Sequence, residues 1–246
     1  ARLGIKAIVV EGSPKEFDWW GLHITQDGAR FFPADDYVGK SLYEIFPSLF
    51  ERFGEKVGIA TIGVSGEHKM GMAGICFNDI DNRPSRYAGR GGLGAVMGSK
   101  GLKFIVINRK GAPGVDYADR DLFEDGRKKL TEALLTAPIT KPKGALNSYG
   151  TAVLINIMNE AGGLPTRNFS EGRFEGAANI AGEALFEGNK ERLGKELYNH
   201  ACSPGCIIQC SNTLYAADGS EIASCVEYES DWSLGANYGI DNLDDI

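Results

Sequence analysis

The sequence predicts a β-rich α+β N-terminal region followed by a mostly α-helical region. Short apolar, β-branched runs dominate the first part of the chain, whereas longer segments with helical spacing dominate the second. The loop Gly111-Ala-Pro-Gly114 lies between the two parts and has turn composition. We therefore expect one unit over residues 1–114 and a second unit over residues 115–246.

In the first region, local patterns predict strands, a hairpin and a helix. Strands are expected at 6–10, 56–64, 72–77 and 104–108. Asp27-Gly28 is typical of the tight turn of a hairpin within 18–33. Apolar residues recur at helical spacing over 41–53, which predicts a helix there. Residues 81–87 have turn composition.

In the second region, helical spacing prevails. Helices are expected at 122–136, 149–161 and 179–200, and another begins within 231–239. A short hairpin is expected within 212–228, turning at Asp218-Gly219.

Composition narrows the class of protein. Hydrophobic residues make up 43% of the 246 residues and charged residues 24%, which is typical of a globular protein. The formal net charge of -7 argues against nucleic acid as a general partner, and no apolar run approaches the length of a membrane span. Five cysteines, an odd number, do not suggest a disulfide framework. We therefore expect the protein to lie in the reducing cytoplasm. Both ends of the sequence resemble cuts within a longer chain.

Residues 83–115 contain no Asp or Glu and six glycines from Gly89 to Gly101. Glycine lets backbone N–H groups approach a ligand closely, and clustered cations attract negative charge, so the stretch predicts a phosphate site rather than a flexible basic loop. Its apolar residues from Leu93 to Met97 resemble a packed helix face. The cationic side chains of the stretch are Arg83, Arg86, Arg90, Lys100, Lys103, Arg109 and Lys110.

Two common phosphate motifs fit this stretch poorly. Gly89-x-Gly91-x-x-Gly94 matches the dinucleotide fingerprint, but residues with turn composition precede it and no acidic residue follows until Asp116. Gly98-Ser99-Lys100 has the wrong order for a Walker-type loop. A nucleotide-dependent dehydrogenase is therefore kept only as an alternative.

The segment from Arg86 to Lys103 closely resembles the signature of the aldehyde:ferredoxin oxidoreductase family, whose members bind a tungsten or molybdenum bis-pterin cofactor. Further blocks resemble the family at 5–12, 149–156, 162–169, 227–230 and 234–237. The resemblance implies an internal fragment of a family chain. Residues 1–114 would be the C-terminal part of an N-terminal cofactor-binding domain, and residues 115–246 the start of a helical domain that carries iron–sulfur cysteines.

The resemblance also implies the residues that hold the pterin and its phosphates, with a magnesium ion bridging the phosphates. Arginine suits this role, because its planar fork contacts a phosphate at two points. A solvated surface charge is the alternative for Arg90, and Tyr87 stands where a small residue is common in the family. The matching residues are Arg86, Tyr87, Ala88, Gly89, Arg90, Gly91 and Gly92.

Three cysteines, Cys202, Cys206 and Cys210, follow one another at intervals of four residues. Such thiolates can hold three irons of a [4Fe–4S] cluster, or they can form a zinc site with His200; three unliganded thiols are the third possibility. The spacing of the cysteines alone does not distinguish an iron–sulfur cluster from a zinc site. The resemblance favours the cluster, with a fourth ligand outside these residues, although the commoner family spacing places the first two cysteines one residue closer.

Glu229 matches the family carboxylate that sits close to the metal, where it can act as a general base or acid. The alternative is a structural carboxylate in the first turn of a helix. The resemblance implies an enzyme that oxidises aldehydes to carboxylic acids and passes electrons through the [4Fe–4S] cluster to ferredoxin, with a homodimer expected for the whole protein. A zinc-stabilised anion-binding module is the alternative from outside the enzymes.

Overall fold

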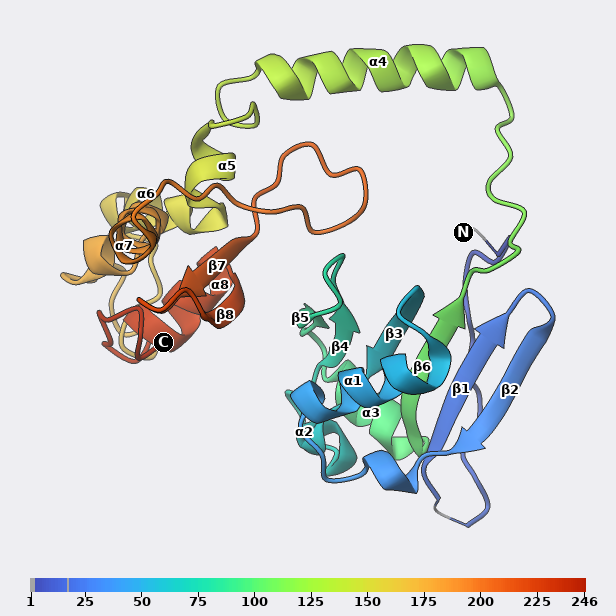
Figure 1. Ribbon diagram of the computed structural model, residues 1–246. Coiled ribbons are helices and arrows are strands. Elements are labelled where there is room, and N and C mark those ends of the chain that lie inside the picture. Colours follow the sequence, from blue (N-terminus) through green and yellow to red (C-terminus); the bar gives the residue numbers. More distant parts are fainter. Residues whose placement is uncertain (1–2, 17) are drawn as a thin grey trace. The chain divides into compact units, whose positions relative to one another are not determined.

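The computed structural model describes residues 3–16 and 18–246 and divides into two compact units, Ala1–Ala118 and Asp119–Ile246 (Figure 1). The first unit is built on a six-stranded sheet, and the second is mostly helical. The predicted fold class is therefore confirmed. Among the described residues, the helices are all too short or too polar to cross a bilayer.

The sheet of the first unit has the strand order β2-β1-β6-β3-β4-β5. Neighbouring strands are antiparallel except β1 and β6, which are parallel. The strands are β1 (Trp20–Thr25), β2 (Gly28–Pro33), β3 (Val57–Thr61), β4 (Ile75–Asn78), β5 (Pro84–Ala88) and β6 (Leu102–Asn108).

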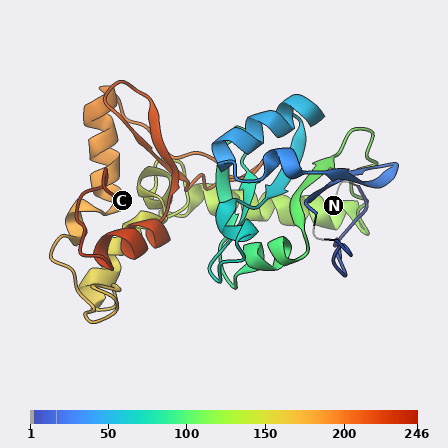
Figure 2. The ribbon, with the colours of Figure 1, turned by 90° about the horizontal axis from the view of Figure 1, so that it is seen from below.

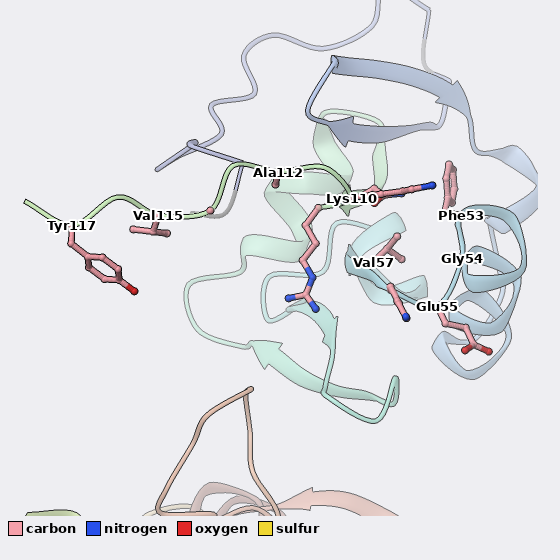
Figure 3. Close-up of a pocket in the computed structure, with 12 residues that line it drawn as sticks. Phe53, Gly54, Glu55, Val57, Lys110, Ala112, Val115 and Tyr117 are labelled. Atoms are coloured by element: carbon pink, nitrogen blue, oxygen red, sulfur yellow. Dashed lines mark hydrogen bonds between the residues drawn. The ribbon is translucent and has the colours of Figure 1, made fainter. Parts of the chain in front are cut away.

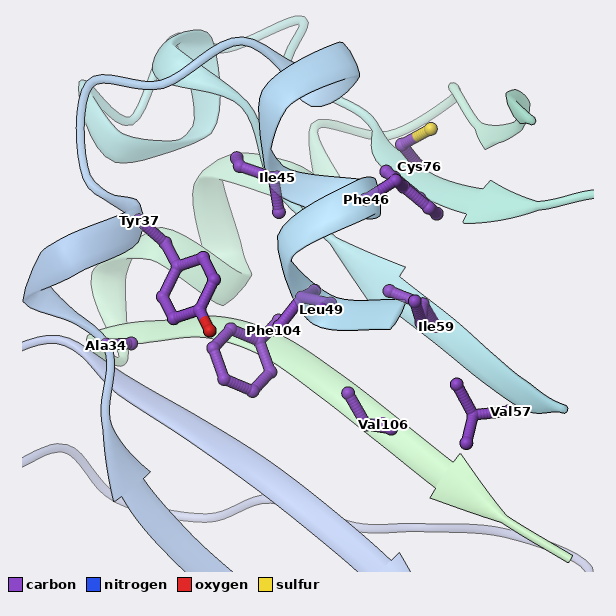
Figure 4. Close-up of a cluster of buried hydrophobic side chains, with 10 residues drawn as sticks. All are labelled: Ala34, Tyr37, Ile45, Phe46, Leu49, Val57, Ile59, Cys76, Phe104 and Val106. Carbon is purple, nitrogen blue, oxygen red and sulfur yellow. The ribbon is translucent and has the colours of Figure 1, made fainter. Parts of the chain in front are cut away.

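Helices cover both faces of this sheet (Figure 2). Helix α1 (Leu42–Phe53) packs Ile45, Phe46 and Leu49 against side chains of β3 and β6, and Figure 4 shows them in one buried cluster that also includes Phe104. The opposite face packs against α3 (Leu93–Ser99), whose Met97 lies in a second cluster with Leu22 and Leu102. The short helices η1 (Asp35–Tyr37) and α2 (Val64–Glu67) complete the unit.

The second unit joins short helices to one hairpin. Its largest apolar cluster includes Ile155, Leu164, Phe174 and Ile180, and a smaller one lies under the hairpin around Leu214. Its elements are α4 (Arg120–Thr136), α5 (Ala145–Tyr149), η2 (Thr151–Val153), α6 (Leu154–Ala161), η3 (Ala177–Asn179), α7 (Gly182–Leu193), β7 (Asn212–Tyr215), β8 (Glu221–Val226), α8 (Tyr228–Ser230) and the π-helix η4 (Asp231–Ala236).

Several local predictions are confirmed and others are wrong. The hairpins at Asp27-Gly28 and Asp218-Gly219 and the helix over 41–53 form as predicted. Residues 6–10 do not form a strand, because no described strand pairs with them, and Val9 is 79% exposed. The predicted helix 149–161 is interrupted at Gly150, whose φ is 64°, and the predicted helix 179–200 ends at Leu193 before a left-handed Gly194.

Candidate cofactor and metal sites

The glycine-rich segment Gly89–Gly92 connects strand β5 to helix α3. The expectation that a turn precedes it was wrong, because residues Pro84–Ala88 pair with β4 as an edge strand. The presence of this strand does not make the segment a dinucleotide-binding motif. β5 runs antiparallel to β4, and the alternating directions through β3 leave β5 antiparallel to β6, so β5-α3-β6 is not the parallel unit that the fingerprint requires.

The glycines of this segment fall into two classes. At Gly92, Gly94 and Gly98 an added Cβ would meet a backbone oxygen of residues 66–74 at well under 3.0 Å, so these glycines allow close packing of α3. At Gly89 and Gly91 an added Cβ would meet nothing within 4 Å. These two positions border open space, where a ligand can approach the backbone.

In the folded chain, two cationic side chains of residues 83–115, Arg83 and Lys103, form ion pairs with acidic residues. Arg83 forms ion pairs with Asp79 at 2.8 Å and Asp81 at 2.9 Å. The side chain of Lys103 is buried, pairs with Glu67 and donates to the carbonyl of Ile62 at 2.6 Å. Burial lowers the pKa of Lys103, and the Glu67 carboxylate opposes this shift. The absence of Asp and Glu along the sequence therefore overstates the local positive charge.

The residues that remain suit an anionic group. Arg90 is exposed between Gly89 and Gly91, and Arg86 is half-buried on β5. Tyr87 is 58% exposed and donates its hydroxyl to the carbonyl of Pro84 at 3.4 Å. An accessible backbone beside an exposed guanidinium suits an anionic group such as a phosphate. The predicted packed face of α3 was partly wrong, since Leu93 and Val96 are 45% and 51% exposed.

A cavity of about 850 Å³ lies elsewhere in the first unit and contains none of the predicted site residues (Figure 3). It borders the end of β6 where Asn108 pairs with Val57, whereas the ladder of β3, β4 and β5 places Gly89 beyond the opposite end. Its cations include Arg109 and Lys110, and the ring of Phe53 forms part of its wall.

The three cysteines of the predicted metal site lie on one loop of the second unit whose two ends are tied together. His200 and Ser211 exchange backbone hydrogen bonds of 3.1 and 3.2 Å. Sequence reasoning missed the buried Asn147. Its side-chain amide donates to the carbonyl of Gln209 at 3.2 Å, and its backbone carbonyl accepts the N–H of Asn199 at 2.9 Å. The loop between these residues is thus closed at its base.

The thiols of Cys202, Cys206 and Cys210 influence one another. Burial raises the pKa of the Cys206 thiol, but hydrogen bonds from the backbone at Gln209 and from Cys202 outweigh it, so the net pKa is lowered. Burial, then Glu227 and the other two thiols, raise the pKa of Cys210. All are free thiols, as a metal ligand requires, although within the described part of the chain no three His, Cys, Asp or Glu side chains are arranged to hold a metal ion. By chemical type, three thiols are donors that an iron–sulfur cluster or a zinc ion accepts.

Glu229 lies in α8 and is exposed. Its neighbour Glu227 accepts a hydrogen bond of 2.6 Å from the Thr151 hydroxyl and caps α8. Asp231, which sequence reasoning missed, follows at the end of the same turn and is completely buried. The structure describes Glu229 and the cysteines in the second unit and the Arg86–Gly92 segment in the first.

Two models of one family match the chain: the aldehyde ferredoxin oxidoreductase N-terminal domain over residues 1–109, and domains 2 and 3 of the same family over residues 126–246. The tungsten-containing aldehyde ferredoxin oxidoreductases of Pyrococcus abyssi and Thermococcus kodakarensis are 39% and 38% identical over 99% of the chain. The chain spans 37% of the length of each relative.

A solved structure has a similar fold. It is the active site complex BamBC of benzoyl coenzyme A reductase with 1,5-dienoyl-CoA, matched with a TM-score of 0.64 over 95% of this chain and 34% of that one. At 19% identity, this likeness shows the fold alone. The two family models, which follow each other in order along the sequence, show that the chain belongs to the aldehyde ferredoxin oxidoreductase family.

Proposed function

We propose that the whole protein oxidises aldehydes to carboxylic acids and passes the electrons to ferredoxin in the cytoplasm. The observation that carries the proposal is the ordered match of both family models, together with relatives named as tungsten-containing aldehyde ferredoxin oxidoreductases. In this reaction, an aldehyde and a water molecule yield a carboxylic acid, two protons and two electrons. The chain's own residues must hold the cofactor, take up a proton and pass on electrons.

Residues Arg86 to Gly92 would hold a tungsten, or molybdenum, bis-pterin, and a magnesium ion would neutralise part of the charge of its phosphates. The exposed Arg90 and the open backbone at Gly89 and Gly91 support this assignment. When bound, the cofactor supplies the two-electron redox chemistry that no side chain can provide.

Cys202, Cys206 and Cys210 would hold a [4Fe–4S] cluster, with the fourth ligand outside these residues. Their thiols are unbridged and lie on a loop with a closed base, which supports the assignment. Such a cluster passes electrons singly, as ferredoxin requires.

Glu229 would exchange the proton of the hydrated aldehyde. Its carboxyl belongs to an exposed residue on a short capped helix, so it can meet a substrate rather than the interior of its own unit. Position near the reacting oxygen is the first requirement of a general base.

The test uses the full-length protein produced anaerobically with tungstate. We expect iron, tungsten and pterin in the wild type, and aldehyde-dependent reduction of a viologen dye. Cys206→Ser should lose iron and visible absorption, whereas the matched control Cys225→Ser on β8 should retain both. Stoichiometric zinc without iron in the wild type would instead establish the zinc-stabilised module and reject the proposal.

Two further pairs of variants separate the roles. Arg90→Ala should lower pterin affinity roughly tenfold to a hundredfold, because it removes a charge-assisted contact of about 1.5–3 kcal/mol. Arg109→Ala, an exposed cation beside the other cavity, should not. Glu229→Gln should lower turnover by roughly 10²–10⁴ with cofactor contents unchanged, and Glu191→Gln, exposed on α7, should leave turnover intact.

A further inference from the structure

Asp231 lies at the junction of α8 and η4, and its side chain is completely buried. Neither carboxyl oxygen has a hydrogen-bond partner within the described part of the chain. The backbone N–H of Asp231 donates to the carbonyl of Glu227 at 3.2 Å, so the residue is held within the turn. An ionised carboxylate in this position would lack both solvent and donors, which strongly disfavours the charged form.

Within the described part of the chain, no cation shifts the ionisation of Asp231. Glu227, four residues earlier and therefore on the same side of the turn, is the charged group that acts on Asp231, and it acts unfavourably. The packed element η2 contributes the Thr151 hydroxyl, which is already donated to Glu227 at 2.6 Å. Tyr228 and Trp232, on either side of Asp231, pack against the apolar cluster around Ile155.

Burial raises the pKa of Asp231 to about 8, and the nearby Glu227 carboxylate adds to the shift. This direction agrees with the geometry, since a proton removes the negative charge that has no partner and turns one oxygen into a donor.

We propose that Asp231 is a positioning residue that keeps its proton at neutral pH and so preserves the Glu227 cap of the turn that bears Glu229. The side chain of Glu227 accepts the backbone N–H of Ser230, and the Ser230 hydroxyl accepts the Glu227 N–H at 3.3 Å. Loss of the Asp231 proton would place a second negative charge beside this cap. The turn would then lose its fixed geometry, and Glu229 would lose its position with it.

The inference rests on the proposed function only for the role of Glu229; the protonation of Asp231 stands apart from it. Activity should therefore fall on the alkaline side as Asp231 ionises. With half ionisation at a pH of about 8, about one molecule in ten keeps the proton at pH 9, so wild-type kcat/KM should fall about tenfold between pH 7 and pH 9. Asp231→Asn cannot ionise, nearly preserves the shape and should remove this fall.

Two measurements on the full-length holoenzyme test the inference. Infrared spectroscopy in heavy water should show the carbonyl stretch of a protonated carboxylic acid at pH 7 in the wild type and in the control Asp245→Asn, an exposed acid near the C-terminal end of the described chain, but not in Asp231→Asn. The band should disappear between pH 7 and pH 9. Its absence from the wild type at pH 7 would overturn the inference, whether or not the variant folds.

The second measurement is the pH profile of aldehyde oxidation. Retention of the alkaline fall in Asp231→Asn would overturn the positioning role, and its loss in Asp231→Asn but not in Asp245→Asn would support it. Failure of the proposed function gives a different result: the wild-type holoenzyme would not oxidise aldehydes, while the infrared band would still report the Asp231 proton. Failure of the Glu229 role alone would leave Glu229→Gln fully active.

Discussion

Replacing Gly98 by alanine separates the structural glycines from those available to a ligand. Gly98 lies in α3, and an alanine Cβ would meet the backbone oxygen of Gly66 at well under 3.0 Å. A backbone oxygen cannot rotate away as a side chain does, so α3 or α2 must shift. Such overpacking costs about 1–3 kcal/mol, while alanine in a helix recovers up to about 1 kcal/mol. A net loss of about 1–2 kcal/mol is expected.

The matched control is Gly89→Ala in the same segment. The alanine Cβ would meet nothing within 4 Å, so the stability should change by no more than about 0.5 kcal/mol. Thermal unfolding of the full-length apoprotein measures both variants, and the loss for Gly98→Ala corresponds to a decrease of roughly 4–8 °C in Tm for a unit of this size. Pterin retention should show the opposite order, with Gly89→Ala weakened and folded Gly98→Ala close to wild type.

Either of two results would refute this division of the glycines. Unfolding of Gly98→Ala at the wild-type temperature would show that α3 does not need the close contact with Gly66. Equal destabilisation by Gly89→Ala would show that Gly89 has a structural role as well, and the open backbone would no longer support a ligand there.

Three other predictions concern buried polar groups. Lys103→Met should destabilise the chain by about 3–5 kcal/mol in thermal unfolding because it leaves the Glu67 carboxylate unpaired, and adding Glu67→Gln should restore part of the loss. Asn147→Ala should cost about 1–3 kcal/mol and speed hydrogen exchange at the base of the cysteine loop, because the carbonyls of Asn199 and Gln209 and the N–H of Lys143 lose their side-chain partner. The pKa of Asp231 is raised in the folded state to about 8, so folding stability should decrease as pH rises from the ordinary Asp range to about 8. Relative to the wild type, urea unfolding of Asp231→Asn should show little change at about pH 4 and a gain that grows to several kcal/mol at about pH 9.

Features with a local cause could be predicted from the sequence. The turn at Asp27-Gly28 forms because its residues tolerate the backbone angles of a tight hairpin, and Gly28 has a φ of 127°. The helix over Leu42–Phe53 has its own apolar face and a cap at Ser41, where Glu44 accepts the backbone N–H at 2.8 Å. In both, the decisive residues lie within a few positions of one another.

Features that depend on distant residues could not be predicted. Strand β5 has turn composition and becomes a strand because β4 offers it an edge. Lys103 belongs to a run of cations along the sequence, yet its partner Glu67 is 36 residues away. The side chain of Asn147 donates hydrogen bonds to the carbonyls of Asn199 and Gln209, which lie 52 and 62 residues later in the sequence. The residues next to Asn147 in the sequence do not indicate this role.

The turn over Glu227–Asp231 shows why a motif and a structure assign different roles to neighbouring carboxyls. Successive helical residues point in different directions, and residues two positions apart face roughly opposite sides. The family resemblance assigns the catalytic role to Glu229, which is exposed. Burial instead points to Asp231 as the carboxyl that keeps its proton, although this residue belongs to no recognised motif. A carboxyl that meets substrate must reach solvent, and a carboxyl that keeps its proton must be shielded from it. One short turn can thus hold both groups, and only the position of each side chain relative to the core distinguishes them.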